Sequence, residues 1–202
     1  MHPLNTVKGA ITAAFVLAVV VGILLSTGAG SAPGLHLPQL DRWLHIVSGV
    51  MWIGLLYYFN VVQTPALGAA AADKGGPGGA GISKYIAPRA LLWFRWAAVA
   101  TWATGAIYLA VGFGDSQAIV RAFTLQPGLQ AIGVGAWLGT VMLFNVWVFI
   151  WPNQKKILGI VPATDEEKAA ARKTAGMASR INFILSVPML LCMGGQSHGL
   201  PF

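Results

Sequence analysis

The chain has 202 residues, of which 56% are hydrophobic, and its mean hydropathy is +0.67. Its 13 Lys and Arg residues and 6 Asp and Glu residues are too few to cover a soluble surface, which excludes a soluble enzyme and a disordered chain. A single cysteine cannot form an internal disulfide, which excludes a disulfide-stapled secreted module. The net charge of +7 comes from short basic clusters between long uncharged runs, a pattern typical of membrane-protein loops rather than of nucleic-acid binding.

Several apolar stretches are long enough to cross a hydrocarbon core as helices, which takes about 20 residues each. Apolar side chains lie on all sides of each stretch, and none shows the two-residue alternation of a membrane barrel strand. The sequence therefore predicts an all-α integral membrane protein, a bundle of five transmembrane helices that forms a single domain over residues 1–202. The expected spans cover residues 9–26, 44–62, 91–113, 129–151 and 181–196.

The first stretch also has features of a signal peptide. Lys8 precedes the apolar core, and small residues follow it from Gly28 to Ala32. A cut after Ala32 would leave Pro33 next to the cleavage point, which is unfavourable, so we expect this segment to be retained as the first helix.

The basic residues divide unequally when five helices are threaded from a cytoplasmic N-terminus. Only Arg42 and Arg121 of the 13 fall outside, so the positive-inside rule predicts a cytoplasmic N-terminus and a C-terminus outside. On the inner side, Thr164 and Glu167 have the spacing of a capping box. We expect a short cytoplasmic helix at residues 165–178, leading into the last span.

Two histidines are expected at the same depth near the outer face, His45 in the second span and His198 at the end of the last. Gly49 and Trp52 follow His45 on the same helix face, where a glycine permits close approach of a flat ligand and an aromatic ring can pack on it. Imidazole is a usual axial ligand of haem, so the pattern indicates a b-type haem between the two histidines. The outer cations, Arg42 and Arg121, would then pair with the haem propionates.

Other interpretations of these residues stay open. A histidine near a helix end is often an interfacial residue bonded to water or a carbonyl, and Gly49 can serve helix packing alone. Met189, Cys192 and Met193 lie close in sequence to His198 and, with His45, would make a copper(I) site, although such residues more often fill gaps in packed helices. The sequence has no Cys-x-x-Cys-His motif for covalent haem and no His-Glu-x-x-His motif for zinc.

A set of polar residues is expected near the cytoplasmic ends of the spans. Interhelical hydrogen bonding is the simpler role for such a set, and a quinone headgroup pocket is the alternative. The set comprises Asn60, Gln63, Arg95, Asn145, Asn153 and Asn182.

Several short motifs together resemble the N-terminal membrane domain of the bacterial membrane-bound urate oxidase family. Each motif is weak alone, and the resemblance covers roughly residues 42–202. The matching segments are Arg42 to Val47, Trp52 to Gly54, Tyr57 to Phe59, Phe144 to Trp147, Trp151 to Lys156, Ala178 to Asn182, Ser186 to Met189 and Ser197-His198.

The resemblance implies a multi-pass protein of the bacterial cytoplasmic membrane, related to urate hydroxylation coupled to electron transfer. In that family the membrane domain is often joined to a cytochrome c domain, which this chain lacks up to Phe202, so we interpret it as a short form. The family's histidines at the matching positions correspond to His45 and His198.

The leading hypothesis is therefore a membrane subunit of an electron-transfer assembly that binds haem b and works with other membrane subunits or a cytochrome c. Three alternatives remain. The first is a cofactor-free structural accessory subunit of a larger membrane enzyme. The others are a copper-handling membrane protein and urate oxidation itself, for which no polar purine pocket can be assembled from the sequence.

Overall fold

The computed structural model describes residues 5–28 and 34–201, and within these ranges the chain forms helices and no strands. The chain divides into two compact units, residues 1–36 and 37–202, which are described separately. The helices are α1 (Val7–Gly28), α2 (Leu37–Tyr57), η2 (Tyr58–Gln63), α3 (Thr64–Ala72), η3 (Ile82–Ile86), α4 (Ala87–Ile107), η4 (Tyr108–Gly112), α5 (Ala118–Phe123), α6 (Gln130–Phe144), η5 (Asn145–Ile150), α7 (Trp151–Ile157) and α8 (Asp165–His198). The segments labelled η are π-helical turns.

The first unit consists of α1, a 22-residue helix without any buried residue and with a mean hydropathy of 2.5. It is long and apolar enough to cross a membrane, and it extends the expected span 9–26 by two residues at each end. The bond between Ala32 and Pro33, where we expect no signal-peptide cleavage, lies outside the described residues.

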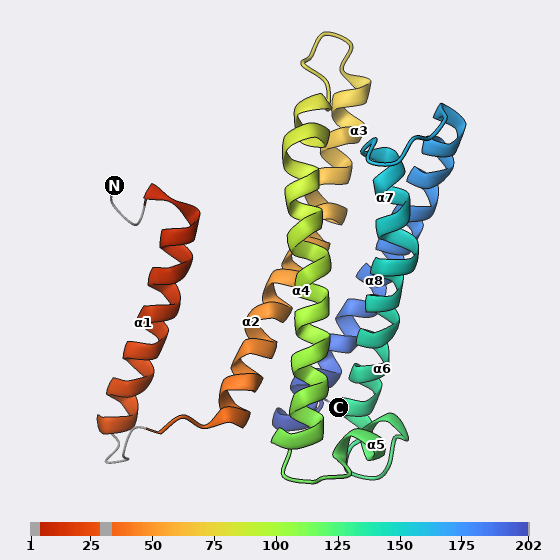
Figure 1. Ribbon diagram of the computed structural model, residues 1–202. Coiled ribbons are helices and arrows are strands. Elements are labelled where there is room, and N and C mark those ends of the chain that lie inside the picture. The colour runs from red at the N-terminus through yellow and green to blue at the C-terminus, as the bar shows by residue number, and fades with distance from the viewer. Residues whose placement is uncertain (1–4, 29–33, 202) are drawn as a thin grey trace. The chain divides into compact units, whose positions relative to one another are not determined.

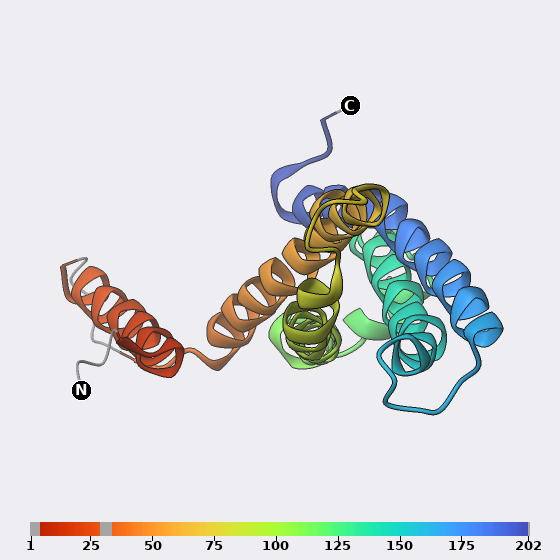
Figure 2. The ribbon, with the colours of Figure 1, turned by 90° about the horizontal axis from the view of Figure 1, so that it is seen from above.

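The second unit is built from long helical rods, two of which pass from an α-helix into a π turn and back into an α-helix (Figure 1). The first rod runs through α2, η2 and α3, and the second returns through η3, α4 and η4. The short helix α5 leads into the third rod, formed by α6, η5 and α7, and α8 returns along it. Seen from above, the rods stand side by side (Figure 2). The start of α2, the end of η4, α5, the start of α6 and the end of α8 therefore lie at one end of the unit (Figure 1).

The all-helical fold is confirmed, but the prediction of five spans is wrong. Four helices among the described residues are long and apolar enough to cross a membrane: Val7–Gly28, Leu37–Ala72, Gln130–Ile157 and Asp165–His198. The stretch expected at residues 91–113 does form a helix, but it is not among the four. Arg95 and several tryptophans lower its mean hydropathy, and Arg95 stacks on the Trp151 ring, 3.8 Å from the ring centroid.

Proline accounts for the position of most π turns. Pro65, Pro88 and Pro152 each stand in the first turn of the α-helix that directly follows η2, η3 or η5. A proline has no N–H and its ring clashes with the carbonyl four residues earlier, so the preceding turn widens to keep the helix continuous. The rods therefore run through their prolines without a loop.

The last helix, α8, is a single element of 34 residues. The ranges expected as a cytoplasmic helix and a separate span are continuous because no helix-breaking residue lies between them. The capping box expected from Thr164 and Glu167 is present: the Thr164 side chain accepts from the Glu167 N–H, and the Glu167 side chain accepts from the Thr164 N–H. These bonds satisfy free backbone donors and fix where α8 begins.

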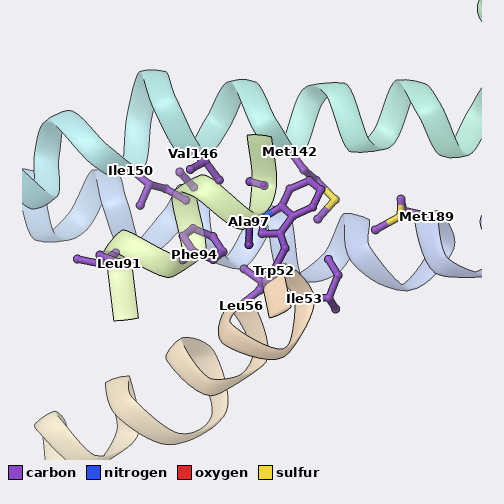
Figure 3. Close-up of a cluster of buried hydrophobic side chains, with 12 residues drawn as sticks. Trp52, Ile53, Leu56, Leu91, Phe94, Ala97, Met142, Val146, Ile150 and Met189 are labelled. Atoms are coloured by element: carbon purple, nitrogen blue, oxygen red, sulfur yellow. The ribbon is translucent and has the colours of Figure 1, made fainter. Parts of the chain in front are cut away.

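The core of the second unit joins all the rods near their middle (Figure 3). Trp52 of α2, Phe94 of α4, Met142 of α6 and Val146 of η5 are each at most 2% exposed, and they pack with Met189 of α8. Burial of an aromatic side chain removes a large apolar area from solvent, so these contacts hold the rods in register.

Candidate functional site

A cavity of about 520 Å³ opens at the end of the second unit that carries α5. Nine of its lining residues come from three of the long helices. They are Arg42, His45 and Trp52 from α2, Thr101, Trp102 and Gly105 from α4, and Met189, Met193 and His198 from α8. The volume lies within the range of about 300–1,000 Å³ typical of small-molecule sites.

His45 is held in the cavity wall by α4. Its Nδ1 lies 2.7 Å from the main-chain oxygen of Thr101, and since a carbonyl can only accept, the imidazole Nδ1–H is the donor. The Thr104 hydroxyl oxygen lies 3.3 Å from the same nitrogen and offers a second acceptor. The proton of the neutral ring is thus on Nδ1, which leaves Nε2 with a free lone pair.

His198 reaches the cavity from the opposite end of the sequence. It is the last residue of α8, its side chain is exposed, and it lines the same cavity as His45. The structure thus brings together the two histidines that the sequence analysis singled out. They differ in their surroundings, because His45 is partly buried and hydrogen-bonded whereas His198 is exposed.

Of the remaining predicted residues, Trp52 and Arg42 line the cavity. Trp52 is 2% exposed and forms part of the core as well as the cavity wall, while Arg42 is exposed. Gly49 faces α4 instead: a Cβ added there would lie 3.7 Å from the Thr101 methyl group. Its position favours the helix-packing interpretation of this glycine.

Arg121, expected beside a ligand, is engaged elsewhere. Its guanidinium donates to Asp115 at 2.6 Å and to the Pro127 carbonyl at 3.3 Å, in the turn around α5. The backbone N–H of Gln117 donates to the same carboxylate, and this bond and Arg121 hold the pKa of Asp115 below its usual value. Arg121 therefore braces the turn that leads from η4 to α6.

The sequence analysis missed Gln196, which ties the end of α8 to the start of α6. Its Oε1 accepts from the Ile132 N–H at 3.1 Å, and its Nε2 donates to the Gly128 carbonyl at 3.0 Å. An N–H in the first turn of a helix has no partner within the helix, so Gln196 caps α6 from a distant part of the chain. Its position two residues before His198 offered a weak signal, since it places an amide at the expected site.

Of the three sulfur-containing residues considered as copper ligands, two line the cavity and the third is not among its lining residues. Met189 and Met193 line the cavity, and Cys192 packs near Gly135 of α6, where a Cβ added to the glycine would lie 3.2 Å from the Cys192 Cβ. Within residues 5–28 and 34–201, no three His, Cys, Asp or Glu side chains gather as metal ligands. Any metal bound by this cavity would therefore need thioether ligands or an imidazole pair.

Three of the six polar residues expected near the cytoplasmic ends, Asn60, Asn145 and Asn182, form hydrogen bonds between helices. Asn60 of η2 donates to the Ser179 hydroxyl of α8 at 2.9 Å. Asn145 of η5 donates to Asn182 of α8 at 2.8 Å. The interhelical interpretation is confirmed for these residues.

Comparison with protein-family models finds a match for the C-terminal part of the chain. Residues 116–202, from just before α5 to the end of the chain, match the family model described as urate oxidase N-terminal. This match confirms the resemblance inferred from the sequence motifs over less than half of the chain. No curated protein and no solved structure matches the chain significantly.

Proposed function

We propose, from the match of residues 116–202 to the urate oxidase N-terminal family model, that the chain is a membrane subunit of an electron-transfer assembly that binds haem b between His45 and His198. The observation that carries this proposal is the single cavity lined by both histidines, which lie at opposite ends of the second unit's sequence. A b-type haem supplies one-electron transfer between its ferrous and ferric states.

The residues present fit this group in three respects. His45 donates from Nδ1 to the Thr101 carbonyl, as metal-bound histidines commonly do, which leaves Nε2 as the atom that would bind the haem iron. His198, which lines the same cavity, is the second candidate ligand. Arg42 supplies a positive charge for a propionate, and Arg121 is excluded from this role because it is paired with Asp115.

The distribution of charge supports an orientation in the bacterial cytoplasmic membrane. The basic end of the second unit carries Lys74 after α3, Lys84 in η3, Lys155 and Lys156 in the last turn of α7, and Lys168 in the first turns of α8. At the cavity end, Arg121 is neutralised by Asp115, and Arg42 follows Asp41. By the positive-inside rule the basic end faces the cytoplasm, so the cavity and the C-terminus face outward.

The haem proposal is tested on the full chain purified in detergent from haem-replete bacteria. A reduced-minus-oxidised spectrum should show a b-type haem, and His45→Ala should abolish it. His198→Ala should leave a haem with one ligand lost, visible as a change from low to high spin. His36→Ala is the matched control, because this exposed histidine precedes α2, and it should leave the spectrum unchanged.

A colourless, haem-free wild-type protein would overturn the proposal. That result would favour a cofactor-free accessory subunit that packs against other membrane subunits. Urate oxidation by the chain itself is tested separately, by following urate absorbance with membranes that contain the wild-type protein or His45→Ala.

A second candidate function, copper(I) binding, is favoured by one specific observation. Met189 and Met193, which are one helical turn apart on α8, line the same cavity as His45 and His198. Thioether and imidazole ligands suit copper(I) better than zinc or magnesium. Metal analysis of the purified chain distinguishes the two functions. Met193→Leu should lower the copper content if copper is bound there, and it should leave a haem spectrum intact if haem is bound.

A further inference from the structure

Gly105 of α4 lies directly against the partly buried ring of His45. A Cβ built on Gly105 would lie 2.8 Å from Cε1 of His45 and 3.1 Å from its Nδ1. Real Cβ atoms essentially never come within 3.0 Å of another heavy atom, so the imidazole occupies space that any other residue at position 105 would fill. Thr101 and Gly105 lie one turn apart on α4, so the acceptor and the open space face His45 together.

We propose that Gly105 and the Thr101 carbonyl are positioning residues that fix the ring orientation and the tautomer of His45, so that Nε2 is presented to the cavity as an acceptor nitrogen. This inference rests on the proposed site, and it defines the kind of ligand that the site accepts. A nitrogen with a free lone pair binds a metal centre or a hydrogen-bond donor, and it repels a ligand that offers only acceptor atoms.

The geometry explains why the Thr101 carbonyl and Gly105 are both needed to fix the orientation and the tautomer of His45. The Thr101 carbonyl accepts from Nδ1 at 2.7 Å, which sets which nitrogen carries the proton. If the ring turned over, Cδ2 would replace Nδ1 beside this carbonyl and the hydrogen bond would be lost. Gly105 allows the ring to lie close enough to α4 for the bond to form. An added methyl group would push the ring away from Thr101.

The Thr104 hydroxyl has a supporting place in this arrangement. It donates to the Ala100 carbonyl at 2.7 Å, so its own oxygen lone pairs remain for the Nδ1–H of His45, 3.3 Å away. Both acceptors beside Nδ1 therefore favour the same tautomer. They also make the neutral ring a stronger ligand, because a hydrogen bond donated by the far nitrogen raises the basicity of Nε2.

The experiment measures the tautomer directly and does not depend on a bound cofactor. Full-length protein with ¹⁵N-labelled histidine is placed in lipid bilayers without haem or copper. Solid-state NMR is recorded well above pH 6.5, the approximate pKa of ordinary histidine, so that the rings are neutral. His45, assigned by comparison with His45→Gln, should show a protonated Nδ1 and an unprotonated Nε2.

Gly105→Ala is the test variant, and Gly54→Ala of α2 is the matched control. A Cβ built at Gly54 meets no atom within 4 Å, so the same substitution there adds a methyl group in open space. Gly105→Ala should abolish the single-tautomer pattern of His45 and give a mixture or the opposite tautomer. Gly54→Ala should leave the wild-type pattern.

Two results would overturn the inference: a wild-type His45 protonated at Nε2, or a Gly105→Ala protein with the wild-type tautomer. If Gly105→Ala does not fold, the tautomer of His45 in the wild-type spectrum tests the inference by itself. A haem-free wild-type protein that shows the expected tautomer would refute the proposed cofactor and leave the role of Gly105 standing. In protein that does bind haem, Gly105→Ala should lower the haem occupancy at least several-fold relative to Gly54→Ala.

Discussion

Asn145 donates a hydrogen bond from its side-chain amide to the side-chain oxygen of Asn182, 2.8 Å away, across the contact between η5 and α8. Asn182 is 0% exposed, and its own amide donates to the Met142 carbonyl at 3.0 Å. Met142 lies just before the point where α6 widens into the π turn η5. The pair therefore links the irregular part of one rod to the regular helix of the next.

We expect Asn182→Leu to destabilise the second unit. The substitution leaves the Asn145 amide without its acceptor and removes a donor from the Met142 carbonyl, both in an apolar interior. An unsatisfied buried polar group costs about 1–3 kcal/mol, although interhelical bonds within membranes average nearer 0.6 kcal/mol. A fall in the free energy of unfolding of roughly 1–2 kcal/mol is expected, measured by denaturant titration in detergent micelles.

Asn153→Ala is the control for this measurement. Asn153 donates to the Phe149 carbonyl within its own rod, so its loss should change the unfolding free energy much less. Equal stability of Asn182→Leu and the wild type would show that the asparagine network contributes nothing to the contact between η5 and α8.

The second prediction concerns Gln196. Gln196→Ala removes the acceptor of the Ile132 N–H, so hydrogen exchange at the start of α6 should become faster. Gln196→Glu keeps an oxygen acceptor and should retain most of the protection of Ile132, while it loses the donor to the Gly128 carbonyl. Exchange detected by mass spectrometry on peptides that cover residues 128–134 checks both results.

The exposed Gln126 provides a control substitution in the neighbouring loop, because Gln126→Ala should leave exchange at Ile132 unchanged. Unchanged exchange in Gln196→Ala would mean that the cap is not formed in solution.

The third prediction separates the two interpretations of Gly49. Gly49→Ala places a methyl group 3.7 Å from the Thr101 methyl group, an ordinary packing distance, so the protein should fold with unchanged ligand binding. Alanine is favoured over glycine inside a helix by about 1 kcal/mol, which should raise the unfolding free energy by up to that amount. Thermal unfolding and a haem spectrum of the same sample check both expectations. If Gly49→Ala instead removed the haem, the glycine would be needed for ligand approach, as its spacing from His45 first indicated.

Much of the architecture could be predicted from the sequence, because it depends on local patterns. Apolar runs predicted the helices, and the spacing of Thr164 and Glu167 predicted where α8 begins. The two histidines could be placed at one end of the second unit because the distribution of basic residues predicts the direction of the helices. The prediction that residues 91–113 span a membrane was wrong because it relied on the length of the apolar stretch and neglected how much Arg95 lowers its mean hydropathy.

The details of the site depend on how helices meet, which sequence patterns do not contain. His45 contacts Thr101 and Gly105, more than 50 residues away, only because α2 and α4 pack in one particular register. Arg121 was predicted to contact a ligand only from its charge and its expected side of the membrane. Its partner, Asp115, lies six residues earlier, and the turn around α5 that brings them together has no distinctive spacing.

The last prediction concerns the ion pair of Asp115 and Arg121. The hydrogen bond from the Gln117 N–H and the contact with Arg121 lower the pKa of Asp115. A carboxylate with a lowered pKa in the folded state contributes stability above its ordinary pKa, and this contribution is lost as the pH falls through the lowered value. Arg121→Gln should raise the pKa of Asp115 only part of the way back, because the Gln117 N–H still donates. Carboxyl ¹³C NMR titration of Asp115 measures this shift, with Arg180→Gln as a control for the loss of one positive charge elsewhere. An Asp115 pKa that is the same in Arg121→Gln and the wild type would show that the pair does not form in solution, and the turn that leads into α6 would then depend on its backbone hydrogen bonds alone.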